Sequence, residues 1–174
     1  MMALSERHVA VLVEDQYQEL EIWYPILRLR EAGVRVTVVG TGGQSSYASK
    51  CGYPCPVDAS IQEVKADPFD GVVIPGGWAP DYLRRYPEVN RFVAALDRAG
   101  GAVAAICHGG WVLCSAKILQ GRRVTSFFAI RDDMEHAGAQ WVDEEVVVDR
   151  NLITARKPDD LPAFMRELLK ALDS

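Results

Sequence analysis

The sequence lacks the features that define membrane and exported proteins. No stretch approaches the roughly 18 consecutive apolar residues of a membrane span. The N-terminal residues lead directly into a strand pattern, without the layout of a cleavable signal. We therefore expect a cytoplasmic protein that is not associated with a membrane.

The sequence also has fewer basic than acidic residues and few cysteines with the spacing of metal ligands. The 19 lysines and arginines are outnumbered by 24 acidic residues, which gives a net charge of −5 and argues against a nucleic-acid partner. Of the four cysteines, Cys51 and Cys55 form one C-x3-C pair, but no second pair with metal-ligand spacing follows. We expect no metal site, and free thiols in a reducing compartment.

No linker, repeat or low-complexity tract divides the 174 residues, so we expect a single domain over 1–174. Valine-rich apolar runs alternate with helical patterns, which predicts an α/β fold with a mostly parallel sheet and helices on both faces. Predicted strands lie at 8–14, 34–39, 71–74, 102–106 and 124–127, with a hairpin over 141–148 and 152–155 and a short one around 47–57. Predicted helices lie at 20–31, 89–99, 111–116, 130–137 and 161–172.

The first predicted helix contains a proline within an apolar pattern. Pro25 cannot bond the carbonyl of Glu21 four residues back, so we expect a kink near Glu21. One face is expected to be buried through the apolar residues Leu20, Trp23, Ile26, Leu27 and Leu29.

The most informative stretch is 102–115, AVAAICHGGWVLCS. Its apolar run stops at Cys107 and His108, two glycines follow, and helical spacing then resumes, which predicts a strand, a sharp turn and a helix. N–H groups at the start of a helix favour a thiolate at Cys107 and can bind an oxyanion formed by its attack on a carbonyl. This pattern indicates a nucleophile elbow. The alternative is that Cys107 is one more small buried hydrophobic residue.

Three loops leave strands at the same edge of the predicted sheet, at 14–18, 75–78 and 107–110, where sites form in such folds. The backbone N–H groups of Gly76, Gly77 and His108 are candidate oxyanion donors. Glu21 could reach the Cys107 sulfur and donate a hydrogen bond if burial raises its pKa; the alternative is an exposed helix glutamate. The other histidines, His8 and His136, are expected to be structural or solvent-facing.

Several motifs together resemble the PfpI branch of the ThiJ/PfpI superfamily, which is class I glutamine amidotransferase-like. The matching segments, in order and spacing, are Glu21-Ile22-Trp23-Tyr24-Pro25, Pro75-Gly76-Gly77, Ala105-Ile106-Cys107-His108-Gly109, Asp132-Asp133-Met134 with Ala137-Gly138, Trp141-Val142-Asp143 and Glu145-Val146-Val147-Val148-Asp149. The resemblance covers essentially the whole chain and implies a flavodoxin-like, doubly wound fold. It also implies that Cys107 is the nucleophile, His108 its partner and Glu21 the acid that hydrogen-bonds the thiol.

Asp81 occupies the place where protease-like members of this family have a glutamate that completes a triad across a subunit interface. The resemblance therefore implies a homo-oligomer, a dimer or a hexamer, although an aspartate is one methylene shorter. Phe127 replaces a family tyrosine at the substrate side, and Trp111 follows Gly110 where the family often has Pro-Gln. Trp78 and Trp111 either narrow the pocket or, for Trp111, belong to the core.

Three functions fit these features, and none requires a cofactor. The first is a stress-protection hydrolase of the glyoxalase III or deglycase type, in which Cys107 attacks a reactive carbonyl or its protein adduct. The second is an intracellular cysteine peptidase using Cys107, His108 and Asp81 of a neighbouring subunit. The third is a redox-sensing, chaperone-like stress protein in which Cys107 becomes a sulfinate held by Glu21. The partner is then a small carbonyl compound or a peptide.

Overall fold

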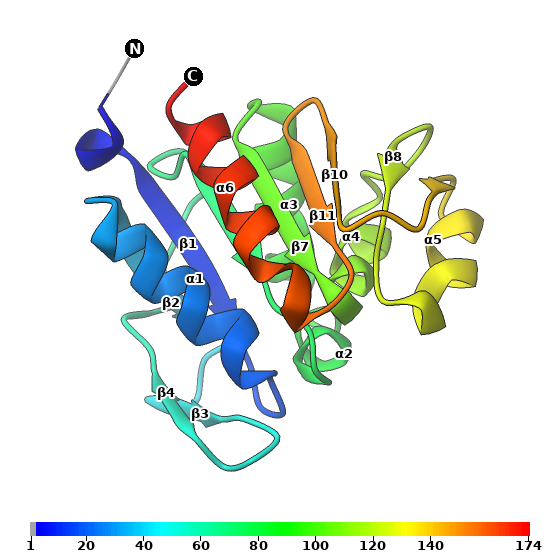
Figure 1. Cartoon of the computed structure of the whole chain (residues 1–174). Helices are drawn as coiled ribbons and strands as arrows, with labels where there is room; N and C mark the ends of the chain where they lie inside the picture. The colour runs from blue at the N-terminus through cyan, green and yellow to red at the C-terminus, as the bar shows by residue number, and fades with distance from the viewer. Residues whose placement is uncertain (1–2) are drawn as a thin grey trace.

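The computed structural model describes residues 3–174, and its central feature is a seven-stranded sheet with the order β10-β11-β7-β6-β1-β2-β5 (Figure 1). All neighbouring strands of this sheet are parallel except β10 and β11. The strands are β1 His8–Val13, β2 Arg35–Gly40, β3 Ser46–Ala48, β4 Pro54–Pro56, β5 Ala59–Ser60, β6 Gly71–Ile74, β7 Ala102–Ile106, β8 Arg123–Val124, β9 Gln140–Trp141, β10 Val146–Asp149 and β11 Leu152–Ala155.

Helices cover both faces of the sheet, as the sequence predicts. The helices are α1 Glu19–Glu31, α2 Ala79–Leu83, α3 Pro87–Arg98, α4 Gly110–Ala116, α5 Arg131–His136 and α6 Leu161–Leu172, with 3₁₀ turns at Leu4–Glu6, Cys107–Gly109, Phe128–Ile130 and Pro158–Asp160. Helices α1 and α6 pack on the face nearer the viewer in Figure 1, and α3 and α4 pack behind it. Every residue of the central strands β1, β6 and β7 is buried, because the strands are sandwiched between these helix layers.

The buried face of α1 differs from the prediction. Leu20 and Leu27 are 54% and 59% exposed, whereas Ile22, Ile26 and Leu29 are buried. Residues seven apart share a helix face, so the Ile22 and Leu29 stripe and the Leu20 and Leu27 stripe cannot both face the sheet. The prediction for Leu20 and Leu27 was therefore wrong. The helix continues unbroken through Pro25.

The segment after α4 also differs from the prediction. The strand expected over 124–127 is shorter: β8 ends at Val124 and pairs in parallel with β9. Thr125 to Phe127 form a loop instead, because the Phe127 N–H donates to the Cys107 carbonyl at 3.2 Å. Both predicted hairpins are present, as β3–β4 and as β10–β11 with Arg150 at a positive φ of 56° in its turn. The strand expected over 141–148 is shorter, however, because β10 begins only at Val146 and Trp141 belongs to β9, which pairs with β8.

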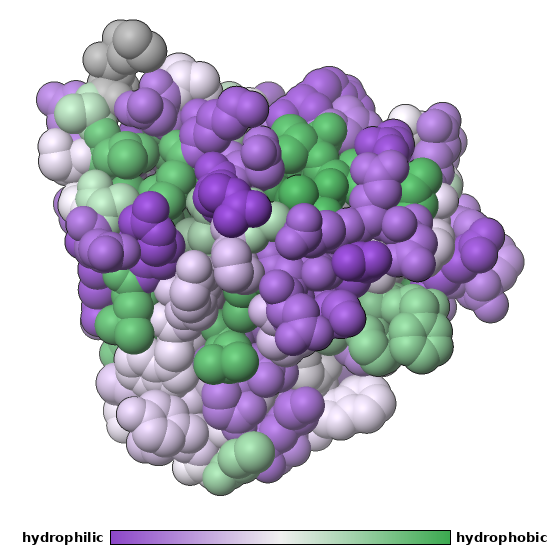
Figure 2. All heavy atoms as spheres, viewed as in Figure 1, coloured by the Kyte–Doolittle hydropathy of each residue, from purple (hydrophilic) through white to green (hydrophobic). Residues whose placement is uncertain are grey.

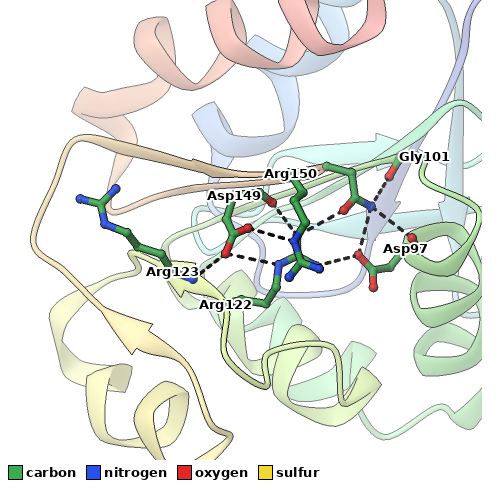
Figure 3. Close-up of polar contacts among 7 residues, drawn as sticks. Asp97, Gly101, Arg122, Arg123, Asp149 and Arg150 are labelled. Atoms are coloured by element: carbon green, nitrogen blue, oxygen red, sulfur yellow. Dashed lines mark hydrogen bonds and ion pairs between the residues drawn. The ribbon is translucent and has the colours of Figure 1, made fainter.

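A buried polar network closes the end of the sheet opposite Cys107 (Figure 3). Arg122 donates to the Asp149 carbonyl at 2.6 Å and to the Asn151 side chain at 3.2 Å, and forms an ion pair with Asp97 at 3.3 Å. Asn151 in turn donates to the Gly101 carbonyl at 2.9 Å. The network joins the β10–β11 turn to the end of α3 and the start of β7.

Within residues 3–174, no helix is long and apolar enough to cross a membrane. The face shown in Figure 2 is mostly polar, and its apolar side chains form separate patches rather than one continuous band.

Candidate active site

Cys107 lies on a sharp turn at the C-terminal end of β7. Its φ is 61°, in the left-handed region that non-glycine residues rarely adopt. A 3₁₀ turn over Cys107–Gly109 leads directly into α4. A Cβ at Gly109 would lie 2.7 Å from the Ile74 carbonyl oxygen, so the turn can pack against β6 only with glycine there. The predicted strand–turn–helix geometry is therefore confirmed.

Glu21 is fully buried beside this turn rather than exposed on its helix. Its backbone N–H is capped by the Gln18 side chain at 3.0 Å, which fixes the start of α1. Its Oε2 accepts a hydrogen bond of 2.7 Å from the Gly76 N–H, and the Cys107 thiol lies close enough to influence the pKa of the carboxyl. The other oxygen, Oε1, is buried without a hydrogen-bond partner among residues 3–174. A Cβ at Gly76 would lie 2.5 Å from Oε2 and 2.7 Å from the Cys107 Cβ. Glycine at this position therefore allows the carboxyl and the thiol to meet.

Burial dominates the electrostatics of this pair. It raises the pKa of Glu21 to about 7, against the lowering effect of the Gly76 N–H. Burial and, to a smaller extent, the Glu21 charge raise the pKa of the Cys107 thiol to about 12. The N–H groups of His108 and Gly77 lower the thiol pKa, as the sequence predicts for an elbow, but burial outweighs them. The Cys107 thiol is therefore protonated at neutral pH, while the Glu21 carboxyl is close to half protonated.

Two of the three predicted oxyanion donors lie near the sulfur. The backbone N–H groups of His108 and Gly77 are close enough to lower the pKa of the Cys107 thiol. The N–H of Gly76 donates to Glu21 Oε2 and is therefore not directed at the sulfur. Gly77 has a φ of 71°, and a Cβ there would lie 2.4 Å from the Gln16 carbonyl oxygen.

The imidazole of His108 lies against the thiol and among aromatic rings. Its Nδ1 is 3.3 Å from the Cys107 Sγ. Its ring stacks on Phe127 at a centroid distance of 4.9 Å and contacts Trp111 at 5.1 Å and Trp78 at 5.6 Å. Trp111 thus lines the site instead of belonging only to the core.

The charge state of His108 suits proton transfer. Burial lowers its pKa, and the Lys50 charge lowers it further. The imidazole is therefore neutral at neutral pH and can accept a proton.

Asp81 does not join this cluster within one chain. It lies on α2 with its side chain 43% exposed, and its carboxylate pairs with Arg85 one turn along the helix. His8 hydrogen-bonds Thr37 at the other end of the sheet, and His136 lies exposed at the end of α5. Cys107 and His108 are thus joined by Glu21 but not by Asp81 of the same chain.

Sequence reasoning missed three residues at this site. Phe128 packs on Phe127 at 4.7 Å, and Asp133 accepts a 2.8 Å hydrogen bond from the Trp111 indole. Lys50 acts electrostatically on both Glu21 and His108. Asp133 belongs to a motif that the sequence analysis noted, but its contact with Trp111 spans 22 residues and depends on the packing of α5 against α4. Among residues 3–174, no three histidine, cysteine or acidic side chains are grouped closely enough to hold a metal.

The mostly parallel sheet with helices on both faces agrees with comparisons against known proteins. The sequence profile of the DJ-1/PfpI family matches residues 7–171. The chain belongs to the DJ-1/PfpI family. The flavodoxin-like fold expected from the resemblance is thereby confirmed.

The curated relatives of this DJ-1/PfpI chain match over nearly their whole length. A deglycase of Pyrococcus abyssi is 43% identical over 164 residues, which are 94% of this chain and 98% of that protein. The deglycase PfpI of Pyrococcus furiosus is 40% identical, with the same coverage. YraA of Bacillus subtilis, whose name gives cysteine protease activity provisionally, is 39% identical over 95% of this chain and 98% of its own.

Solved structures show the same fold. A two-domain protein of Anabaena variabilis, with DJ-1/ThiJ/PfpI-like and ferritin-like domains, superposes with a TM-score of 0.93 at 42% identity. The match covers 95% of this chain and 48% of that one, so this chain spans about half of the two-domain protein. DJ-1beta of Drosophila melanogaster superposes with a TM-score of 0.91 at 28% identity, covering 97% of this chain and 91% of that one.

Proposed function

We propose that this protein is a cytoplasmic, cysteine-dependent hydrolase that acts on reactive carbonyl compounds or on the adducts they form on proteins. The observation that carries the proposal is the buried Glu21 carboxyl against the Cys107 thiol, with the His108 imidazole 3.3 Å from the same sulfur. The names of the archaeal deglycase relatives support this substrate class. A reducing compartment keeps Cys107 in the thiol form that the chemistry needs.

The chemistry needs only water as a second reactant. With methylglyoxal, the Cys107 sulfur adds to the aldehyde carbon and a proton passes to the aldehyde oxygen, giving a hemithioacetal. Glu21 or His108 then moves a proton from the former aldehyde carbon to the neighbouring ketone carbon, through an enediol, which leaves a thioester of lactate. Water cleaves the thioester, releasing lactate and restoring the thiol. The N–H groups of His108 and Gly77 stabilise the oxyanions formed at the addition and hydrolysis steps.

A cysteine peptidase is the second candidate, because the Asp81 carboxylate is exposed on α2. In that case the chain forms a homo-oligomer, a dimer or a hexamer, and Asp81 of one subunit orients His108 of another. Its carboxylate must first exchange its intrachain partner Arg85 for that imidazole. The provisional protease name of the Bacillus relative supports this candidate.

Turnover of methylglyoxal and of a fluorogenic peptide, measured on one sample whose size is also determined, tests both candidates. The wild type is compared with Cys107→Ser, and with Cys51→Ser as a control because Cys51 is an exposed free thiol. Lactate formation lost only in Cys107→Ser establishes the carbonyl enzyme. Peptide cleavage that depends on Cys107 and on the oligomer establishes the peptidase. Inactivity in both assays rejects both candidates, and selective peroxide oxidation of Cys107 would then favour the redox-sensing alternative.

A further inference from the structure

A continuous aromatic surface borders the nucleophile. Phe127 contacts the His108 ring from the loop after β8 and Trp111 contacts it from α4, while Trp78 approaches it from the loop after β6. The two tryptophan rings also contact each other at 6.3 Å. Phe128 extends the surface beyond Phe127 at 4.7 Å. The rings thus form one surface from Trp78 to Phe128, with the thiol and His108 at its centre.

This surface is open to solvent at both ends. Trp78 is 53% exposed and Phe128 is 72% exposed, although large aromatic rings are usually buried. Phe127 and Phe128 also line a cavity of about 360 Å³ together with Arg156 and Lys157. Exposed apolar rings grouped beside a reactive residue are typical of a ligand-contact surface.

Trp111 is fixed in place before any ligand binds. Its indole N–H donates to Asp133 at 2.8 Å, and the Arg84 guanidinium lies 5.9 Å from its ring centroid. A side chain held in one orientation loses little conformational entropy when a flat ring stacks on it. Trp111 is therefore suited to hold a planar group.

We propose that this surface selects carbonyl substrates that carry a flat aromatic or conjugated group next to the reacting aldehyde. This inference rests on the proposed function, since it specifies the substrate of the same Cys107 site. The group stacks on the surface formed by Trp78, Trp111, Phe127 and Phe128, while the aldehyde carbon meets the sulfur. For an arylglyoxal the balance is that of methylglyoxal: the aldehyde and one water give one aryl hydroxy acid, and the thiol is regenerated.

Three aldehydes are compared as substrates: phenylglyoxal, cyclohexylglyoxal and methylglyoxal. Their kcat/KM values distinguish an effect of a planar ring from an effect of the size or apolar character of the substituent. Cyclohexylglyoxal has a saturated ring of similar size, so it can fill space but cannot stack. We expect kcat/KM for phenylglyoxal to exceed that for cyclohexylglyoxal by about three- to tenfold. The rate measured with Cys107→Ser is subtracted, because phenylglyoxal also reacts with arginine side chains.

Trp78→Leu, Trp111→Leu and Phe128→Leu test the surface, and Tyr24→Leu is the matched control because Tyr24 is an exposed aromatic residue on α1. We expect the phenyl-to-cyclohexyl ratio to fall toward one in the three site variants and to stay at the wild-type value in Tyr24→Leu. General damage to the site lowers kcat/KM for all three aldehydes together and leaves the ratio unchanged. Methylglyoxal therefore serves as the internal reference.

Binding of two acids tests the same surface without chemistry. Mandelate and its saturated counterpart hexahydromandelate are titrated while tryptophan fluorescence is recorded, and mandelate is expected to bind about three- to tenfold more tightly. If no aldehyde is turned over but mandelate is preferred, the proposed function fails and the aromatic surface stands. Turnover with equal phenyl and cyclohexyl values, or equal binding of the two acids without turnover, overturns the inference.

Discussion

The Glu21 carboxyl accepts a 2.7 Å hydrogen bond from the backbone N–H of Gly76, across 55 residues of sequence. The bond joins the first turn of α1 to the loop that follows β6. It aims the acid at the Cys107 thiol from two segments that the sheet holds rigidly, so the position of the proton donor does not depend on a mobile loop.

Replacing Glu21 by glutamine should change how stability depends on pH. The pKa of this carboxyl rises from its ordinary value of 4.5 to about 7 in the fold, so between these values the folded chain binds more protons than the unfolded chain. The free energy of unfolding contributed by Glu21 therefore falls as pH rises through this range, by about 3 kcal/mol. Urea unfolding at about pH 5 and about pH 8 should show this loss in the wild type, relative to Glu21→Gln.

Glu31→Gln is the control for that measurement, because Glu31 is an exposed glutamate on the same helix. It should follow the wild type at both pH values. His8 acts in the opposite direction: burial lowers its pKa, so its contribution to stability is lost as pH falls below about 6.5. Taking the difference between wild type and variant removes this shared effect. An identical pH dependence in wild type and Glu21→Gln would contradict a raised Glu21 pKa.

Glu21→Gln should also lose turnover while it keeps the fold. The amide can still accept from the Gly76 N–H and donate to the sulfur, but it cannot exchange a proton. We expect kcat for the carbonyl substrate to fall by about 10²- to 10⁴-fold, with Glu31→Gln at the wild-type value. Circular dichroism and lactate formation measured on the same samples check this expectation, and a near-normal kcat would assign proton transfer to His108 alone.

Gly76→Ala should damage both stability and activity. The added methyl would lie 2.5 Å from the Glu21 Oε2 and must push the carboxyl away from Cys107. We expect destabilisation by about 1–3 kcal/mol and loss of turnover. Gly100→Ala is the comparison: Gly100 has a φ of 81° but open space around it, so alanine there adds backbone strain of about 1 kcal/mol and leaves activity intact. Equal turnover by the two variants would show that the Gly76 contact is dispensable.

Arg122→Met should destabilise the chain without affecting turnover. The Arg122 side chain is buried, and its removal leaves the largely buried carboxylates of Asp97 and Asp149 without their shared cation (Figure 3). We expect a loss of about 2–4 kcal/mol in unfolding free energy. The neighbouring Arg123→Met removes a largely exposed ion pair with Glu144 and should cost less than about 1 kcal/mol. Similar midpoints of urea unfolding for the two variants would count against the network.

The elbow was predictable because its signal is local. An apolar run that stops at Cys107, followed by two glycines and helical spacing, specifies strand, turn and helix within one short stretch. The burial of Glu21 was not predictable from the residues alone, since it depends on the Gly76 N–H, which lies far away in the sequence. Its assignment came from the family motif.

The buried face of α1 and the surroundings of Trp111 also could not be predicted from the sequence. The pattern on α1 fits two apolar stripes, and only packing against the sheet selects the one with Ile22 and Ile26 over the one with Leu20. Likewise, an apolar pattern on α4 cannot distinguish a core tryptophan from one that contacts His108, because the choice is made by α5 through Asp133. The spacing of apolar residues predicts where a helix forms, but tertiary contacts decide which of its faces is buried and against which residues.

The left-handed backbone conformation of Cys107 costs stability at the residue that carries the reactive thiol. An L-residue with a φ of 61° gives up about 1 kcal/mol relative to glycine. Cys107→Gly would relieve this strain, but it would also remove a buried side chain from the core, a loss of similar size. The strained backbone therefore belongs to the residue whose side chain the proposed chemistry needs, so the position of the thiol and the cost of the turn cannot be changed separately.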